Sequence, residues 1–265
     1  RWPAENAHHG RDCCLAAQEQ LSNDSRKTIS GAANAVFIGH GPPQGDIAFL
    51  FPGQGSQYPG MGRDLICCFP SSLEAFQEVE QHLEAEHTLS EYIYPRLPGE
   101  TAAYSERLRK TEIAQPAIGA VSAAMLEALA YFGIVPSAAC GHSYGELVAR
   151  HAAGRIDRAT MCSLSIARGR FMAQAGAGDN DPGAMLAVSA PIEELDRSAA
   201  VSGSEMVLAN RNSPHQGVLS GATSAIETAE KACQGKGWKT MRLPVAAAFH
   251  SSLVSAAQAP FQKVV

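Results

Sequence analysis

The sequence lacks several features that would assign it to a membrane, secreted or nucleic-acid-binding class. It contains no uninterrupted apolar run of the roughly 18 residues that a membrane span needs, and no segment has the pattern of a signal peptide. Charged residues make up only 18% of the chain, and the net charge of −5 leaves no basic excess for nucleic acid. We therefore expect a cytoplasmic protein with neither a membrane nor a nucleic-acid partner.

Disulfides and metal sites are not indicated either. The seven cysteines are odd in number, include the adjacent pairs Cys13–Cys14 and Cys67–Cys68, and show no C-x-x-C spacing. This pattern is typical of free thiols in a reducing compartment. The histidines have no H-E-x-x-H spacing, so the sequence predicts no metal.

The 265 residues are enough to bury a substantial core, and 45% of them are hydrophobic. Residues 1–45 are polar and rich in Gly, Ser and Asn, which favours a linker with a short helix near residues 12–21. Order is expected to begin at a strand over residues 46–51 that stops at Pro52.

Helical patterns dominate the region over residues 46–182. The clearest runs from Thr111, an expected N-cap, to Phe132, and Pro116 is expected to kink or restart it. Residues 138–140 are predicted to form a short buried strand. Further helices are predicted over residues 71–85, 88–96, 146–153 and 157–175.

The pattern changes over residues 183–244. Strands and helices are predicted in the order β-α-β-β-α-β, which suits a ferredoxin-like unit. We therefore expect an α/β fold in which this small subdomain is inserted into a larger α/β subdomain, formed by residues 46–182 and 245–265.

The strongest chemical signal is Gly141–Gly145, which fits G-x-S-x-G with a strand before it and a helix after it. This is the context of a nucleophile elbow, in which a sharp turn exposes Ser143 beside the N–H groups of a helix N-terminus. The alternative is a plain glycine-rich turn between a strand and a helix.

A nucleophilic serine needs a base, and nine histidines compete for that role. His250 is the best candidate, because it follows an apolar run at the expected return to the large subdomain. The alternative is a hydrogen-bonded core histidine.

Two further features carry chemistry. The loop over residues 51–57 matches neither a dinucleotide fingerprint nor a P-loop, and exposes N–H groups that can complete an oxyanion hole. It can equally be a simple strand-terminating loop. Arg168 lies in an apolar helical stretch, where a buried guanidinium needs an anionic partner. A structural ion pair is the favoured partner from the residue alone, and a substrate carboxylate is the other.

In combination, these residues resemble the malonyl-CoA:acyl carrier protein acyltransferases of fatty-acid and polyketide synthesis. The resemblance extends from about residue 46 to 265, and Arg168 also fits it. The segments that carry it follow in the family's order: Gly53–Gln57, Thr111–Ala117, Gly141–Glu146, Asn210–Pro214 and Ala248–Ser251.

The resemblance implies a role for each site residue. Ser143 would be the acylated nucleophile and His250 its base, and the N–H groups of Gln54 and Tyr144 would bind the oxyanion. A malonyl carboxylate would pair with Arg168, in a pocket also lined by two further residues, Gln115 and Phe249. The bulk of Phe249 resembles the malonyl pattern and would crowd a methylmalonyl substituent.

The resemblance also implies the partners and the fold. The substrate would be malonyl-CoA and the acceptor the phosphopantetheine thiol of an acyl carrier protein, with no metal or bound cofactor. The fold would be α/β-hydrolase-like, with a ferredoxin-like insertion. Residues 1–45 resemble the linker after an upstream ketosynthase, and family members continue beyond the point matching Val265, with elements that help to orient the histidine.

Tyr144 and two flanking stretches further resemble the acyltransferases of enediyne-type iterative polyketide synthases and of polyunsaturated fatty acid synthases, with the polyketide side favoured. Two other functions share the motif. A serine hydrolase or thioesterase would hydrolyse acyl-CoA without a carrier protein, and a non-catalytic docking domain would not acylate Ser143.

Overall fold

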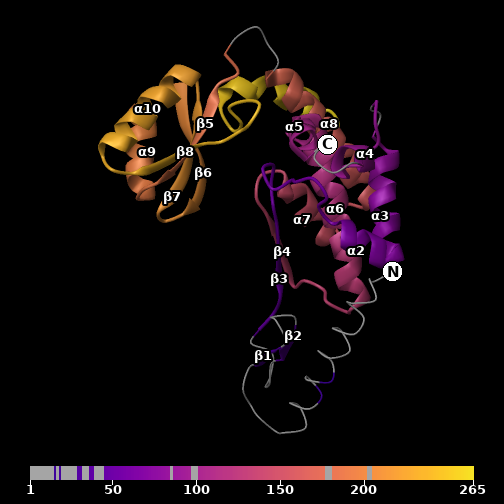
Figure 1. The fold of residues 1–265 in the computed structure, drawn as a ribbon. Helices are drawn as coiled ribbons and strands as arrows, with labels where there is room; N and C mark the ends of the chain where they lie inside the picture. The colour runs from indigo at the N-terminus through magenta and orange to yellow at the C-terminus, as the bar shows by residue number, and fades with distance from the viewer. Residues whose placement is uncertain are drawn as a thin grey trace. The chain divides into compact units, whose positions relative to one another are not determined.

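The computed structural model describes residues 15, 18, 29–31, 36–38, 45–83, 86–96, 101–176, 181–201 and 205–265 (Figure 1). The chain divides into two compact units, Arg1–Ile47 and Ala48–Val265. Each is described by itself.

The first unit contains two short strands that the sequence analysis did not predict. β1 (Ile29–Gly31) pairs antiparallel with β2 (Val36–Ile38), with Ser30 opposite Phe37. Three residues are too few to show a period of two, which is why this part of the predicted linker carried no strand signal. Of the helix predicted near residues 12–21, Leu15 and Gln18 are helical and the others lie outside the described residues.

The second unit begins with a parallel strand pair. β3 (Ala48–Phe51) lies beside β4 (Ala138–Gly141), with Phe51 opposite Gly141. The strand predicted over residues 138–140 is confirmed as β4, but the prediction that it is buried is wrong, since Ala138 and Cys140 are exposed, as is Leu50 on the neighbouring strand. Only alternate positions of the pair face the helices, because successive side chains of a strand point to opposite sides.

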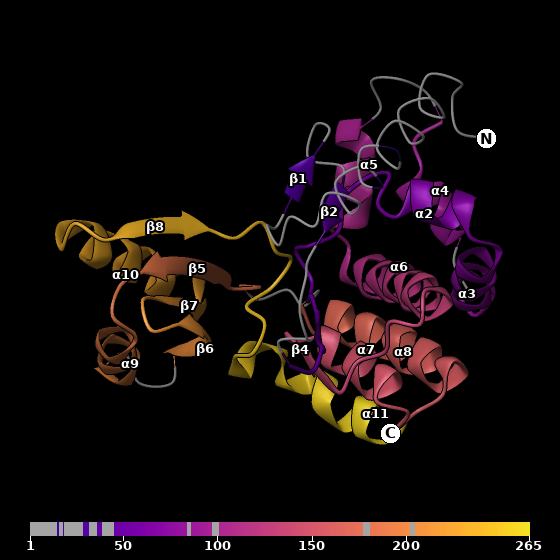
Figure 2. The same cartoon turned by 90° about the horizontal axis from the view of Figure 1, so that it is seen from below.

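Helices form the rest of the large subdomain. α6 (Thr111–Tyr131) is its centre and packs against α3 (Pro70–Gln81) and α8 (Arg158–Gly176), as Figure 2 shows. The other elements of this subdomain surround these three: α2 (Arg63–Cys68), α4 (Leu89–Ile93), α5 (Thr101–Leu108), α7 (Gly145–Ala152), η2 (Ser252–Ala257) and α11 (Gln258–Gln262).

Two details of α6 differ from expectation. The helix passes through Pro116 without a break, and Thr111 is its first residue rather than its cap, which is Lys110. Among the described residues, α6 is also the one helix that is long and apolar enough to cross a membrane, but 72% of its most apolar window is buried. Most of α6 is therefore packed inside the large subdomain.

The small subdomain is an antiparallel sheet of four strands in the order β6-β7-β5-β8. With its two helices it has the chain order β-α-β-β-α-β, the ferredoxin-like arrangement. Its elements are β5 (Ala184–Ser189), α9 (Ile192–Val201), β6 (Met206–Ser213), β7 (Gln216–Gly221), α10 (Thr223–Gly235) and β8 (Lys239–Arg242).

Both faces of this sheet are covered. Leu186 and Leu219 belong to a buried cluster with residues of α9 and α10. On the opposite face, Met185 and Val218 pack against Phe249 of the returning chain. The alternation along the strands therefore assigns one face to the helices and the other to the segment that leads to His250.

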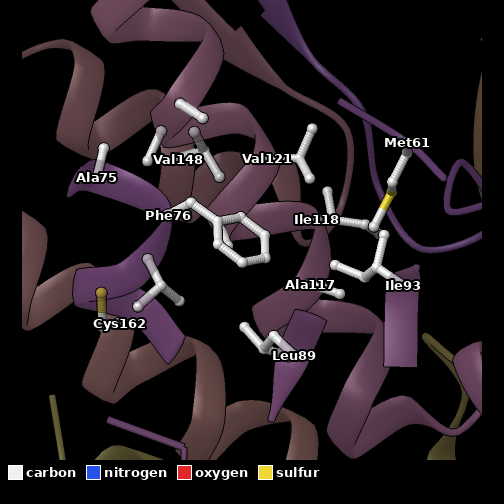
Figure 3. Packing of buried hydrophobic residues seen from close by; sticks show 14 of the residues in the cluster. Met61, Ala75, Phe76, Leu89, Ile93, Ala117, Ile118, Val121, Val148 and Cys162 are labelled. Carbon is white, nitrogen blue, oxygen red and sulfur yellow. The ribbon is translucent and has the colours of Figure 1, made fainter. Parts of the chain in front are cut away.

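Apolar packing holds the large subdomain together. Figure 3 shows the Phe76 ring of α3 among the side chains of Ile118, Val121 and Leu89. Phe76 is 2% exposed, whereas Leu73 on the same helix is 40% exposed.

This difference in burial predicts the cost of truncating each side chain. Phe76→Ala leaves a cavity in the core and should lower the free energy of unfolding by about 3–5 kcal/mol. Leu73→Ala, the control on the exposed side of α3, should cost about 1 kcal/mol or less. Urea denaturation followed by circular dichroism measures both, and equal costs would contradict the assignment of the core.

Candidate active site

Ser143 sits on a sharp turn between β4 and α7. Its φ is +52°, a left-handed conformation that a non-glycine residue seldom adopts. The turn requires glycine on both sides of it, because a Cβ on Gly141 would lie 2.0 Å from the carbonyl carbon of Gly145, and a Cβ on Gly145 would lie 2.2 Å from the Phe51 oxygen. Local sequence thus dictates the elbow, and the strain is concentrated at the serine.

The loop after β3 lies against this elbow. The His142 N–H donates to the Phe51 carbonyl at 2.9 Å, and a Cβ on Gly53 would come within 2.5 Å of the His142 oxygen. Within the described part of the chain, the backbone N–H groups of Gln54 and Tyr144 donate to no hydrogen bond. Two free donors therefore occupy adjacent loops at the carboxyl ends of parallel strands, where α/β proteins commonly bind ligands.

His250 reaches Ser143 from the far end of the sequence. Its Nε2 lies 2.8 Å from the Ser143 Oγ, and its own φ is +63°. Burial lowers the pKa of the imidazole, and the positive charge of Arg168 lowers it further. The neutral ring is thus favoured, which suits a base. No hydrogen bond from the described residues reaches Nδ1.

Arg168 lines the same cavity as Ser143 and His250. The cavity has a volume of about 480 Å³. Burial lowers the pKa of the half-buried guanidinium, which makes no ion pair with any described residue. The structural ion pair that the sequence favoured is therefore not found in the described chain. The Glu146 carboxylate lines the same cavity and raises the pKa of Arg168 without forming an ion pair with it.

The Tyr144 side chain points away from this cavity. It is completely buried, and its hydroxyl lies 2.7 Å from the Ser165 Oγ. A Cβ on Gly119 would lie 2.2 Å from the Tyr144 oxygen, so this small residue makes room for the phenol. Burial raises the pKa of Tyr144. The side chain is part of the core, and only the backbone of Tyr144 borders the site.

Gln115 and Phe249 do not line the cavity. The amide of Gln115 is fully buried, with its Nε2 3.4 Å from the Oε1 of Gln54. Gln54 in turn donates to the hydroxyl of Thr111 at 3.2 Å. Phe249 is buried against the small sheet and lines a different cavity, of about 400 Å³. Both residues therefore lie outside the cavity, next to residues that form the site.

Sequence reasoning missed two charged residues of the cavity, Glu146 and Arg150. The negative charge of Glu146 raises the pKa of His250 against the larger lowering effects. Their spacing was available in the sequence, because positions three and seven residues after Ser143 share one face of the helix that follows it. Among the described residues, no group of three or more His, Cys, Asp or Glu side chains is placed to hold a metal ion.

An α/β fold with a serine on a strand–turn–helix elbow, paired with a histidine, defines a class of enzymes that use a nucleophilic serine. The family model described as acyl transferase domain matches residues 48–265. The chain belongs to this acyl transferase domain family.

Known relatives are polyketide synthases. The chain is 38% identical over 243 residues to the spectinabilin polyketide synthase system protein NorB of Streptomyces orinoci, covering 91% of this chain and 10% of that protein. It is 34% identical over 265 residues to the polyketide synthase GfsA of Streptomyces halstedii, covering 96% and 3%. The chain thus spans a tenth or less of the length of these two relatives.

Two solved structures that resemble this chain are also acyltransferases. The acyltransferase domain from the second module of the salinomycin polyketide synthase superposes with a TM-score of 0.75 at 32% identity, over 94% of this chain and 55% of that one. The malonyl CoA-acyl carrier protein transacylase of Clostridium perfringens superposes with a TM-score of 0.72 at 33% identity, over 83% and 67%.

The close approach at the elbow gives a stability prediction. Gly145→Ala forces a Cβ against the Phe51 carbonyl and should lower the free energy of unfolding by about 3 kcal/mol or more. Gly235→Ala is the control, because a Cβ there meets nothing within 4 Å and Gly235 ends a helix. Thermal unfolding of the two variants tests the expectation, and a Gly145→Ala protein as stable as the control would disprove the tight elbow.

Proposed function

We propose that this chain transfers a malonyl group from malonyl-CoA, through an ester on Ser143, to the phosphopantetheine thiol of an acyl carrier protein. The observation that carries the proposal is the cation of Arg168, which has no described ion-pair partner and shares a cavity with Ser143 and His250. The names of two similar solved structures support the proposal. One is a malonyl CoA-acyl carrier protein transacylase, and another is a carrier protein in complex with its malonyl-transacylase.

In the first half of the reaction, Nε2 of His250 accepts the proton of Ser143 as Oγ attacks the thioester carbonyl. The 2.8 Å contact between these atoms supports direct proton transfer. The free N–H groups of Gln54 and Tyr144 would bind the oxyanion, at the positive end of the helix that follows the elbow. Collapse of the tetrahedral intermediate expels coenzyme A, whose sulfur takes the proton from His250.

The second half repeats these steps with a different nucleophile. His250 removes the proton of the phosphopantetheine thiol, and the thiolate attacks the malonyl ester. The same N–H groups would stabilise the second oxyanion, and Ser143 leaves with the proton that His250 held. The cycle is ping-pong and needs no redox cofactor, since only an acyl group and protons move.

Substrate choice would depend on Arg168. A guanidinium binds a carboxylate through two parallel hydrogen bonds, which acetyl-CoA cannot form. Gln115 would hold the side chain of Gln54. Because Phe249 does not line the cavity, discrimination against a methylmalonyl group would depend on the fit of a single methyl group and is expected to be modest, about 1–3 kcal/mol.

The setting we propose is a cytoplasmic multidomain polyketide synthase, with a ketosynthase before this chain. The relatives support the polyketide side of the prediction. Membership of the enediyne-type group stays a prediction.

The role of Arg168 predicts a change in substrate choice. Arg168→Ala should lower kcat/KM for malonyl-CoA by roughly 10–100-fold, because charge-assisted hydrogen bonds to the carboxylate are lost, and should leave acetyl-CoA almost unaffected. Intact mass after brief mixing with malonyl-, methylmalonyl- or acetyl-CoA measures the adduct. Ser143→Ala should form none. Arg170→Ala, two residues away on the exposed side of α8, is the control.

Two outcomes would reject the proposal. Hydrolysis of malonyl-CoA without transfer to a carrier protein would indicate a serine hydrolase. Absence of an adduct from every donor would indicate a non-catalytic domain.

The lowered pKa of His250 predicts a pH profile. Acylation needs the neutral ring, so the rate should be level near pH 7 and fall about tenfold per pH unit below an inflection that lies under the ordinary value of 6.5. Arg168→Gln removes a positive charge beside the ring and should move the inflection to higher pH. Stopped-flow acylation at pH 5–8 measures both profiles, with Arg170→Gln as the control. An inflection unmoved by Arg168→Gln would contradict the coupling.

A further inference from the structure

A hydroxyl of the small sheet contacts the backbone next to His250. Ser220 lies on β7 and is completely buried, and its Oγ donates to the carbonyl oxygen of Phe249 at 2.7 Å. Its neighbour Leu219 faces the helices of the small subdomain, so Ser220 faces the returning chain. No other hydrogen bond reaches the Phe249 oxygen from the described residues.

The accepting carbonyl belongs to a tight turn. Ser251 N–H donates to the Ala248 oxygen at 3.3 Å, which makes Phe249 and His250 the two central residues. The positive φ of His250 at the second central position is the feature that separates a type II turn from a type I turn. The two turn types differ mainly in the orientation of the peptide between the central residues, and here that peptide carries the Phe249 carbonyl.

The other hydrogen bonds of the turn do not involve that central peptide. Ala248 is held at its N–H by the Pro182 carbonyl, at 2.9 Å, and at its oxygen by the Ser251 hydroxyl, at 2.6 Å. These contacts fix the first residue and the closing residue. Only the Ser220 bond acts on the peptide whose rotation would change φ of His250.

We propose that Ser220 is a positioning residue for His250. Its hydroxyl holds the Phe249–His250 peptide in the orientation that gives His250 its left-handed φ, and so presents Nε2 to the Ser143 Oγ. A non-glycine residue in this region is strained and persists only where its surroundings determine it. The inserted sheet thereby forms part of the active-site machinery. This inference rests on the proposed roles of Ser143 and His250.

The test measures the reactivity of Ser143 with a fluorophosphonate probe in the intact protein. The serine oxygen bonds to phosphorus, fluoride leaves, and the serine proton passes to His250, so the readout needs no acyl donor. Ser220→Ala frees the peptide to rotate and should slow labelling on the order of 10–100-fold, the size of effect expected from misplacing a reacting group. Ser220→Thr retains the hydroxyl and should label within about threefold of the wild type.

A matched control separates positioning from stability. Ser72 is also completely buried and donates to a backbone carbonyl, that of Ala124, at 2.7 Å, but in the large subdomain away from His250. Ser72→Ala and Ser220→Ala should show similar drops in melting temperature, and Ser72→Ala should label at the wild-type rate. Equal slowing in both variants would overturn the proposal.

A double-mutant cycle tests whether Ser220 acts through His250. If it does, Ser220→Ala should cause no further slowing in a His250→Ala background. The same fold-loss in both backgrounds, or wild-type labelling of Ser220→Ala alone, would overturn the proposal. Fluorophosphonate labelling of a protein that forms no malonyl adduct would reject the proposed function and still test Ser220.

Discussion

The 2.8 Å contact between Ser143 and His250 is the constraint on which the rest of the structure depends, because it joins residues 107 positions apart. Each partner is held in a left-handed conformation that an isolated chain would avoid. Parallel pairing of β3 with β4 and the glycines of the elbow hold the serine, while the small sheet and the turn hold the histidine. The large and small subdomains thus each supply the support for one partner.

Features with a local signature could be predicted from the sequence. The glycines that flank Ser143 predict the elbow. The β-α-β-β-α-β order of the small subdomain follows from the alternation of apolar residues in its strands, their helical periodicity in its helices, and the turn residues between these elements. His250 and Arg168 could be identified because each is a polar residue in an apolar stretch. His250 ends such a stretch, and Arg168 lies in the middle of one. Each of these signals lies within a few residues of the position it marks.

Features that depend on packing between distant segments could not be predicted. Whether Gln115 faces a cavity or hides behind Gln54 depends on how α6 meets the loop after β3, and no sequence period encodes that contact. The exposed Cys140 was mistaken for a buried residue because an apolar run shows composition but not which elements cover it. An ion pair with a protein carboxylate is the partner that the sequence favours for Arg168, and only the assembled cavity shows that Glu146 shares the cavity without forming one.

The insertion of the small sheet between the serine and the histidine also has a consequence for synthesis of the chain. A polypeptide grows from its N-terminus, and domains commonly fold as they emerge. The elbow is therefore complete while the sheet that precedes His250 is still being made. In the mechanism that we propose, Ser143 therefore has no base beside it until that sheet has folded and the turn behind it has closed. With the proposed roles of Ser143 and His250, the order of the segments delays the reactivity of Ser143 until the chain has been made past His250.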